Sequence, residues 1–242
     1  MLQRVSGISE AQAYERANFS KTTEAYTRLA NPSEAVDLIL VYEGAPNDQW
    51  LGNPLELEKH AVGRDALVFL TSKSNPVDGI TSAQARDIYA GKITNWKQLG
   101  GKDEAIVAYQ RPGDSGSQIL MQKLVMGDTA MTDAPTELRI AEMGGLMDAI
   151  ASYQSGGSAL GYSVYYYAQN MYQNPDLKLL KIDGVAPSNQ TISAGDYPFL
   201  NPFYAVVRAN AAKDSPARQL LNWILSDAGA RCVEDAGYVA AK

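Results

Sequence analysis

The sequence predicts an α/β protein, because short apolar runs of strand length alternate along the chain with runs of helical periodicity. Residues 37–42 (DLILVY) and 65–71 (DALVFLT) are nearly continuous apolar segments, which are typical of buried strands. Residues 216–228 show a helical pattern instead, with Pro216 at the first helical position. A chain of 242 residues can bury a substantial core, in one domain or in two lobes.

The first half of the chain is expected to contain three helices and three strands. Thr22 and Thr23 precede one of the helices, where a threonine hydroxyl can cap a first-turn amide. Segments 43–46 and 75–79 contain Gly and Pro and are expected to be turns. The expected elements are helices over 10–16, 24–29 and 81–89 and strands over 37–42, 65–71 and 105–109.

The second half is expected to continue the same alternation. A loop over 111–117 leads into a helix-like run, and glycines at 156–157 end a later helix. The expected elements are helices over 118–126, 142–154 and 216–228 and strands over 159–164, 177–182 and 202–208.

The loop Arg111-Pro-Gly-Asp-Ser115-Gly116-Ser117 carries the main functional signal. The first amides of a helix have no partners inside the helix, and the helix dipole favours negative charge there. An arginine adds a planar fork of donors that matches an oxyanion. The loop therefore predicts a small-anion site; taken alone, an ordinary polar turn with a helix cap explains it about as well.

Composition argues against several other functions. The formal net charge of −6 and a pI near 4.9 argue against nucleic acid as the main partner. One histidine (His60) and one cysteine (Cys232) give no zinc constellation, no internal disulfide and no nucleophile–base pair. His60 is expected in a polar connection, and Cys232 as buried filler in a helix. No apolar stretch is long enough to span a bilayer, and no signal peptide is evident.

Tyrosines Tyr162, Tyr165, Tyr166 and Tyr167 are compatible with two roles. They suit the lining of a sugar or aromatic ligand site, and they equally suit packing with a polar tip at a lobe surface, which we favour.

Several motifs occur in the order that they have in one known family. They are GRDALV at 63–68, NPV at 75–77, IT at 80–81, IYAGKITNW at 88–96, RPGDSGS at 111–117, ALGY at 159–162, DGVAPS at 183–188, GDYP at 195–198 and WILS at 223–226. From about Phe19 to the end the chain thus resembles the PstS-like phosphate-binding proteins, the substrate-binding components of phosphate ABC transporters, and especially their Gram-positive members. Loop 111–117 matches the R-x-x-x-S-G-S/T loop of that family.

The resemblance implies a type II periplasmic-binding-protein fold. Two α/β lobes, 1–73 plus 200–242 and 74–199, are joined by two crossover hinges, with the ligand between them. Arg111, Ser115, Gly116 and Ser117 then form the second lobe's half of the site.

The first lobe's half is implied to include Thr22 and Thr23 as hydroxyl and amide donors. A family carboxylate that accepts the proton of hydrogen phosphate falls near Glu43. Such a carboxylate rejects sulfate at neutral pH, because a buried acceptor without a donor opposite it is costly. A solvated turn glutamate is an equally good interpretation of Glu43.

The sequence departs from the family at its beginning. Members start with a strand ending in Asp-Gly-Ser/Thr and a helix, and residues 1–18 contain no such segment. A truncated chain, a second chain that supplies the element, or loss of tight phosphate binding each explain this. An exposed sheet edge invites pairing, so we expect a tendency to form homodimers or to fill the edge with the chain's own N-terminus.

The favoured function is therefore binding of inorganic phosphate for an ABC importer, with the transporter permease as partner. The expected location is extracellular or in the cell envelope, as a Gram-positive-like lipoprotein with its leader absent from this chain. Neither cofactor nor metal is expected, and an enzyme is the weakest reading. The alternatives are a PstS-like sensory or protein-interaction module with weak or lost anion binding, and a binder of another oxyanion such as sulfate, molybdate or tungstate.

Overall fold

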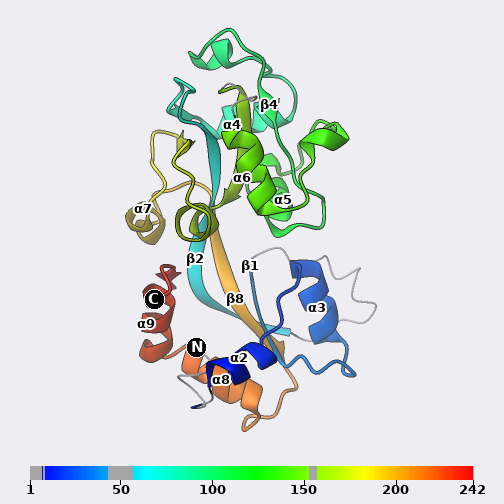
Figure 1. Ribbon diagram of the computed structural model, residues 1–242. Helices are drawn as coiled ribbons and strands as arrows, with labels where there is room; N and C mark the ends of the chain where they lie inside the picture. The colour runs from blue at the N-terminus through cyan, green and yellow to red at the C-terminus, as the bar shows by residue number, and fades with distance from the viewer. Residues whose placement is uncertain (1–6, 8, 43–56, 153–156, 242) are drawn as a thin grey trace. The chain divides into compact units, whose positions relative to one another are not determined.

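The structure is a computed structural model that describes residues 7, 9–42, 57–152 and 157–241 (Figure 1). The chain forms two compact units, Met1–Arg64 with Pro202–Lys242 (unit 1) and Asp65–Asn201 (unit 2). It passes between them twice, inside strand β2 (Leu57–Ser72) and inside strand β8 (Leu200–Arg208). Helices and strands alternate, so the predicted mixed α/β class is confirmed. Within the described ranges, no helix is both long and apolar enough to cross a membrane.

Unit 1 is a sheet with helices packed on both faces. Its strands β1 and β8 pair antiparallel, and β9 pairs antiparallel with β2 at Gly63 and Arg64. Successive residues of β8 point to opposite faces, so Ala205 and Val207 pack with α8 and α9, whereas Val206 packs with α3. The elements, besides the first part of β2 and most of β8, are α2 Glu10–Arg16, α3 Thr22–Ala30, β1 Leu38–Tyr42, α8 Pro216–Ile224, α9 Asp227–Asp235 and β9 Val239–Ala240.

Unit 2 is built around the second part of β2. Strand β5 lies between β2, its antiparallel partner, and β4, its parallel partner, and β6 pairs antiparallel with β2. A short parallel pair, β3 with β7, stands apart. The elements are β3 Gly79–Ile80, α4 Ser82–Tyr89, β4 Val107–Ala108, α5 Gly116–Leu120, α6 Met143–Ala151, β5 Ala159–Val164, β6 Leu177–Leu179, β7 Lys181–Ile182, α7 Asn189–Ala194, the 3-10 turns η2 Trp96–Leu99 and η4 Thr136–Leu138, and the π-helical segments η3 Met121–Met126 and η6 Tyr167–Met171.

The two faces of the unit 2 sheet have different cores. Leu70 on β2 packs against Leu146 and Ile150 of α6. Its neighbour Phe69 points to the other face, into an aromatic cluster with Tyr89 of α4 and Tyr162 of β5, whose ring centroids lie 6.1 and 6.4 Å away. Tyr162 is fully buried in this cluster and not at a lobe surface, where the sequence placed it.

Several expected boundaries differ from the structure. Strand β2 begins at Leu57, well before residue 65, so His60 lies in a strand and not in a connection. The run 216–228 is two helices, α8 and α9, and the run 177–182 is two strands that join different sheets. The strand expected over 105–109 is shorter and spans only Val107–Ala108 (β4). The helix expected over 142–154 is Met143–Ala151 (α6), and the end of the expected range, 153–154, lies outside the described residues. Cys232 is free and half-buried in α9.

Candidate functional site

The loop 111–117 links a strand to a helix within unit 2. After β4, the amide of Tyr109 still donates to the carbonyl of Leu160 on β5 at 2.8 Å, so the chain enters the loop aligned with the sheet. The loop ends at Ser115, which is the N-cap of α5 with extended backbone (φ −80°, ψ 143°). The predicted helix start after the loop is therefore confirmed at Ser115.

Ser115 is buried, and its hydroxyl oxygen accepts a hydrogen bond from the amide of Gln118 at 3.3 Å. Its own amide donates to the carbonyl of Pro112 at 3.0 Å, which closes the turn. These are the contacts of an ordinary helix cap. The cap uses the hydroxyl as an acceptor, so the hydroxyl proton stays available for a ligand.

Arg111 and Ser117 differ from Ser115, because their buried polar atoms have no partners among the described residues. These atoms are Nε and Nη1 of Arg111 and Oγ of Ser117, and the Ser117 residue is only 5% exposed. Buried donors without partners are rare and costly in folded proteins. An ordinary polar turn does not explain them, whereas a bound anion would pair them.

Two neighbouring side chains hold the loop in place. The backbone amide of Arg111 donates to the hydroxyl of Tyr162 at 3.1 Å and to Oε1 of Gln118 at 3.2 Å. The Tyr162 hydroxyl in turn donates to Gln118 Oε1. Burial raises the pKa of Tyr162 far above its ordinary value, so the hydroxyl stays protonated and keeps donating. The loop is therefore anchored to β5 at its first residue.

The charge on Arg111 lies in a partly desolvated place. Burial lowers the pKa of Arg111, and the neighbouring Tyr162 and Glu142 side chains partly offset this effect. No carboxylate of the described chain makes an ion pair with Arg111. An arginine remains protonated even so, which leaves a positive charge beside the first turn of α5 with no ion-pair partner among the described residues.

The other expected site residues lie in unit 1 or outside the described chain. Thr22 and Thr23 are the first two residues of α3, and the N-cap is Lys21, which makes no side-chain cap hydrogen bond. The threonines are therefore inside the helix and not before it, where their amides belong to the first turn and lack helical partners. Glu43 lies outside the described residues.

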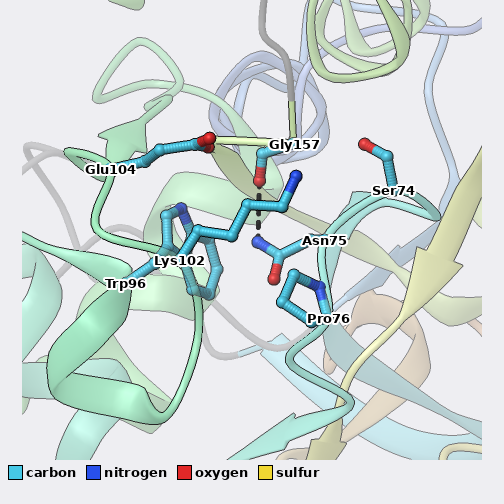
Figure 2. A pocket seen from close by; sticks show the side chains of 7 residues that line it. All are labelled: Ser74, Asn75, Pro76, Trp96, Lys102, Glu104 and Gly157. Atoms are coloured by element: carbon cyan, nitrogen blue, oxygen red, sulfur yellow. Dashed lines mark hydrogen bonds between the residues drawn. The ribbon is translucent and has the colours of Figure 1, made fainter.

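A small hollow elsewhere in unit 2 differs from the loop 111–117, because none of the described residues that line it has a buried side-chain polar atom without a partner. It is lined by Ser74, Asn75, Pro76, Trp96, Lys102, Glu104 and Gly157 (Figure 2). Its buried amide, on Asn75, is engaged: Nδ2 donates to the carbonyl of Gly157 at 2.7 Å, and Oδ1 accepts from the amide of Val77 at 2.9 Å. Among the described residues, no three His, Cys, Asp or Glu side chains are grouped as metal ligands.

The comparisons with known proteins agree with this fold. A family model described as a PBP superfamily domain matches residues 13–228, and the chain belongs to that superfamily. Its sequence relatives include the phosphate-binding protein PstS of Borreliella burgdorferi, 27% identical over 182 residues, which cover 74% of this chain and 64% of the relative. PstS of Bacillus subtilis is 28% identical over 72% of this chain and 55% of its own length. The chain thus spans between half and two thirds of these relatives.

Solved structures show the same fold. A substrate-binding protein from Clostridium perfringens, solved with bound phosphate, aligns with a TM-score of 0.74 at 23% identity, covering 92% of this chain and 85% of its own. An ABC-type phosphate transport receptor from Vibrio cholerae aligns with a TM-score of 0.67 at 22% identity, covering 84% and 80%. Membership of the PBP superfamily and the predicted fold class are confirmed.

Proposed function

We propose that this chain binds inorganic phosphate as the substrate-binding component of a phosphate ABC importer. One observation carries the proposal: the buried Nε and Nη1 of Arg111 and Oγ of Ser117 have no hydrogen-bond partners among the described residues. The names of the sequence relatives, which are phosphate-binding proteins, support phosphate as the anion. We also propose that the chain binds phosphate without catalysing a reaction.

The loop chemistry suits a phosphate dianion. Arg111 supplies charge and two donors, and the hydroxyls of Ser115 and Ser117 add two more. The amides of Gly116 and Ser117 are in the first turn of α5 and have no partners inside the helix. Phosphate is held by such convergent donors without any need for a basic protein, which agrees with the net charge of −6.

The proposal assigns the remaining contacts to Thr22, Thr23 and Glu43 in the lobe 1–73 plus 200–242, with the loop in the lobe 74–199. This part requires the two lobes to close on the ligand, as hinged binding proteins do. Small-angle X-ray scattering with and without phosphate tests it: a smaller radius of gyration with phosphate is expected, and an unchanged one would contradict it.

Three further features belong to the same proposal. The partner is the transporter permease, and the location is the outer face of the cell envelope, as a lipoprotein.

A homodimer formed through the sheet of unit 1 is supported by β1, which is the last strand of the described order and exposes 49% of Leu40. Gel filtration with light scattering tests the dimer, and a monomer at all concentrations would exclude it.

The decisive experiment is isothermal titration with phosphate and with sulfate at neutral pH. Wild-type chain is expected to bind phosphate, and Arg111→Ala is expected to weaken that binding by about 100-fold or more. Arg231→Ala on α9 removes the same charge from an exposed position and serves as the matched control. Absence of phosphate binding by the wild type would overturn the transport proposal and favour a sensory or protein-interaction module that has lost anion binding. Preference for sulfate, molybdate or tungstate would reassign the anion.

A further inference from the structure

Asn201 at the start of β8 has a buried amide that nothing in the described chain satisfies. The residue is fully buried, at 0% exposure, and neither Nδ2 nor Oδ1 has a hydrogen-bond partner among the described residues. An amide that is buried with its donor and its acceptor both unused is unfavourable unless a ligand or an ordered water pairs them. Asn201 therefore needs an occupant beside it.

The strand register places Asn201 opposite Asp65 of β2. The amide of Leu67 donates to the carbonyl of Phe199 at 2.9 Å, and a Cβ on Gly63 would lie 2.5 Å from the ring of Phe203. These two pairs show that β2 and β8 run in opposite directions, and they put residue 201 across from residue 65. Asp65 Oδ1 accepts from the amide of Tyr166 at 3.0 Å.

Asn201 lies on the sheet face that carries the anion loop. Side chains alternate along a strand, so Asp65, Leu67 and Phe69 of β2 share a face, and Asn201, across from Asp65, lies on that face. The Phe199 ring packs on Phe69 at 6.0 Å, and Phe69 packs on Tyr162. The Tyr162 hydroxyl accepts from the backbone amide of Arg111. One face of the unit 2 sheet therefore connects Asn201 to Arg111.

Both residues also lie at the same end of that sheet. Strands β4 and β5 are parallel, and their C-terminal ends lead to Arg111 and to Tyr165. Strand β2 is antiparallel to β5, so its first residue in unit 2, Asp65, lies at this end too, together with Asn201. Adjacent strands are about 4.8 Å apart, so three strand spacings, about 14 Å, separate β4, which leads to Arg111, from β8. An extended arginine side chain, an oxyanion and the Asn201 amide can together span such a distance.

We propose that Asn201 is a further ligand-binding residue of the anion site. Its Nδ2 donates to one oxygen of the anion, and its Oδ1 accepts a proton of dihydrogen phosphate other than the one assigned to Glu43, which makes Asn201 a determinant of selectivity for protonated phosphate over sulfate. Sulfate has no proton to offer at neutral pH, so it would leave Oδ1 unpaired. This inference rests on the proposed binding of phosphate by the same site.

Isothermal titration of Asn201→Leu with phosphate and with sulfate tests the inference. The substitution keeps the size of the side chain and removes both polar atoms. We expect it to weaken phosphate binding by about tenfold or more, because two hydrogen bonds are lost, and to change sulfate binding less. The ratio of phosphate to sulfate affinity should therefore fall.

The matched control is Tyr197→Phe in the same unit. The Tyr197 hydroxyl is also buried and without a partner among the described residues, in a residue 1% exposed. Tyr197→Phe is expected to leave phosphate affinity within twofold of wild type. Both substitutions remove an unpaired buried group, so both should maintain or raise the melting temperature of the ligand-free protein. Affinity thus separates a ligand contact from a structural effect.

The outcomes separate this inference from the proposed function. If Arg111→Ala abolishes phosphate binding but Asn201→Leu binds both anions as wild type does, only the role of Asn201 is overturned, and its amide holds a water. If wild-type chain binds neither anion, both proposals fail. Should Asn201→Leu not fold, Asn201→Asp keeps the shape and replaces the donor by a negative charge. That variant is expected to lose at least as much phosphate affinity, and unchanged affinity would refute the contact.

Discussion

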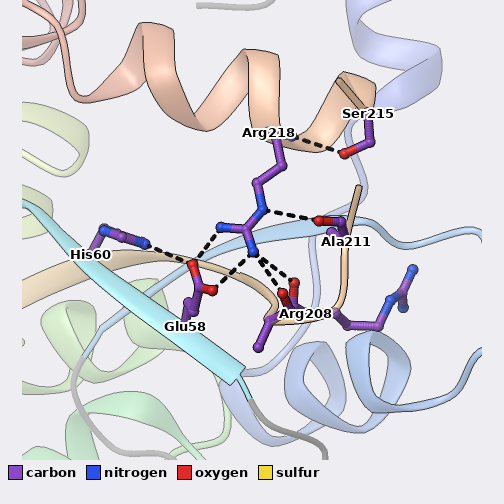
Figure 3. Close-up of polar contacts among 7 residues, drawn as sticks. Glu58, His60, Arg208, Ala211, Ser215 and Arg218 are labelled. Atoms are coloured by element: carbon purple, nitrogen blue, oxygen red, sulfur yellow. Dashed lines mark hydrogen bonds and ion pairs between the residues drawn. The ribbon is translucent and has the colours of Figure 1, made fainter. Parts of the chain in front are cut away.

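Two partly buried arginines, one in each unit, have opposite surroundings. Arg218 in α8 forms a two-pronged contact with the Glu58 carboxylate, its Nη2 also donates to the carbonyl of Ala209 at 2.9 Å, and its Nε donates to that of Ala211 at 3.4 Å (Figure 3). In unit 2, Nε and Nη1 of Arg111 have no hydrogen-bond partner among the described residues. Burial alone therefore does not define a structural arginine, because the chain pairs the donors of Arg218 but not these two donors of Arg111 within the described ranges.

Local sequence prepares the Arg218 contact. The Ser215 hydroxyl caps α8, and Pro216 occupies the first helical turn, which sets the start of the helix. Arg218 in the same turn then reaches back to the carbonyls that follow β8 and to Glu58 at the start of β2. Arg218, by hydrogen bonding, and more weakly His60 lower the pKa of Glu58 from 4.5 to about 2. The contact therefore fastens α8 to the sheet of unit 1.

The largest expected difference between the two arginines is in ligand affinity. Arg111→Met should raise the dissociation constant for phosphate by about 100-fold or more, because the charge and the fork of donors are lost. Arg218→Met should leave it within twofold. Titration calorimetry on both variants checks this, and equal losses in the two would erase the distinction.

The second expected difference is in the sign of the stability change. Arg218→Met should lower the melting temperature by several degrees, since it leaves Glu58 and the carbonyls without their donor. Arg111→Met should maintain or raise the stability of the ligand-free protein, by up to about 1 kcal/mol, because it removes unpaired buried donors. Thermal and urea unfolding in phosphate-free buffer measure both. A clear destabilisation by Arg111→Met would indicate an undetected structural partner.

A third expected difference appears in acid. The pKa of Glu58 is lowered in the folded state, so its stabilising contribution is complete above pH 4.5 and is lost as the pH falls toward about 2. Glu58→Gln should remove that part of the pH dependence, whereas Arg111→Met should leave it unchanged. Urea unfolding midpoints between pH 2 and pH 6 provide the measurement. If Glu58→Gln had the same dependence of stability on pH as wild type, the ion pair between Glu58 and Arg218 would add little to stability.

The smallest expected difference separates two serines of one loop. Ser115→Ala should destabilise the protein by about 1 kcal/mol, since a helix cap is lost. Ser117→Ala should have almost no effect on stability, because its hydroxyl has no partner in the described part of the chain, but it should weaken phosphate binding by about tenfold. Unfolding and titration of both variants decide the matter, and a reversed pattern would make Ser117 the structural residue.

Local signals in the sequence were enough for some of these features. The Pro at the start of α8, the capping Thr81 before α4 and Ser115 before α5 each lie next to the groups they fix, so the helix starts were predictable. The apolar runs at β1 and β5 also predicted their strands. The loop 111–117 was predicted to bind an anion because its arginine, hydroxyls and helix start are contiguous.

Features that depend on distant contacts were not predictable. The first part of β2 has exposed and half-buried polar residues and resembled a connection, yet Glu58 and His60 belong to the strand. The break between α8 and α9 follows from packing: a Cβ on Gly229 would lie 2.1 Å from the carbonyl oxygen of Ile224, so only glycine allows this close turn. Asn201 was missed because nothing near it in sequence shows that its amide is buried without a partner among the residues that the structure describes.

Unit 2 is one continuous stretch of the chain and unit 1 is two separate stretches, which affects the order in which they can fold during synthesis. Unit 2 is one uninterrupted stretch, Asp65–Asn201, whereas unit 1 needs residues from both ends of the chain, including the last helix and β9. A ribosome therefore finishes all of unit 2 before the C-terminal part of unit 1 exists, and domains generally fold as units during synthesis. The part of the protein that carries Arg111 is thus able to fold first, while the N-terminal segment must wait for its partner strand β8 to be made.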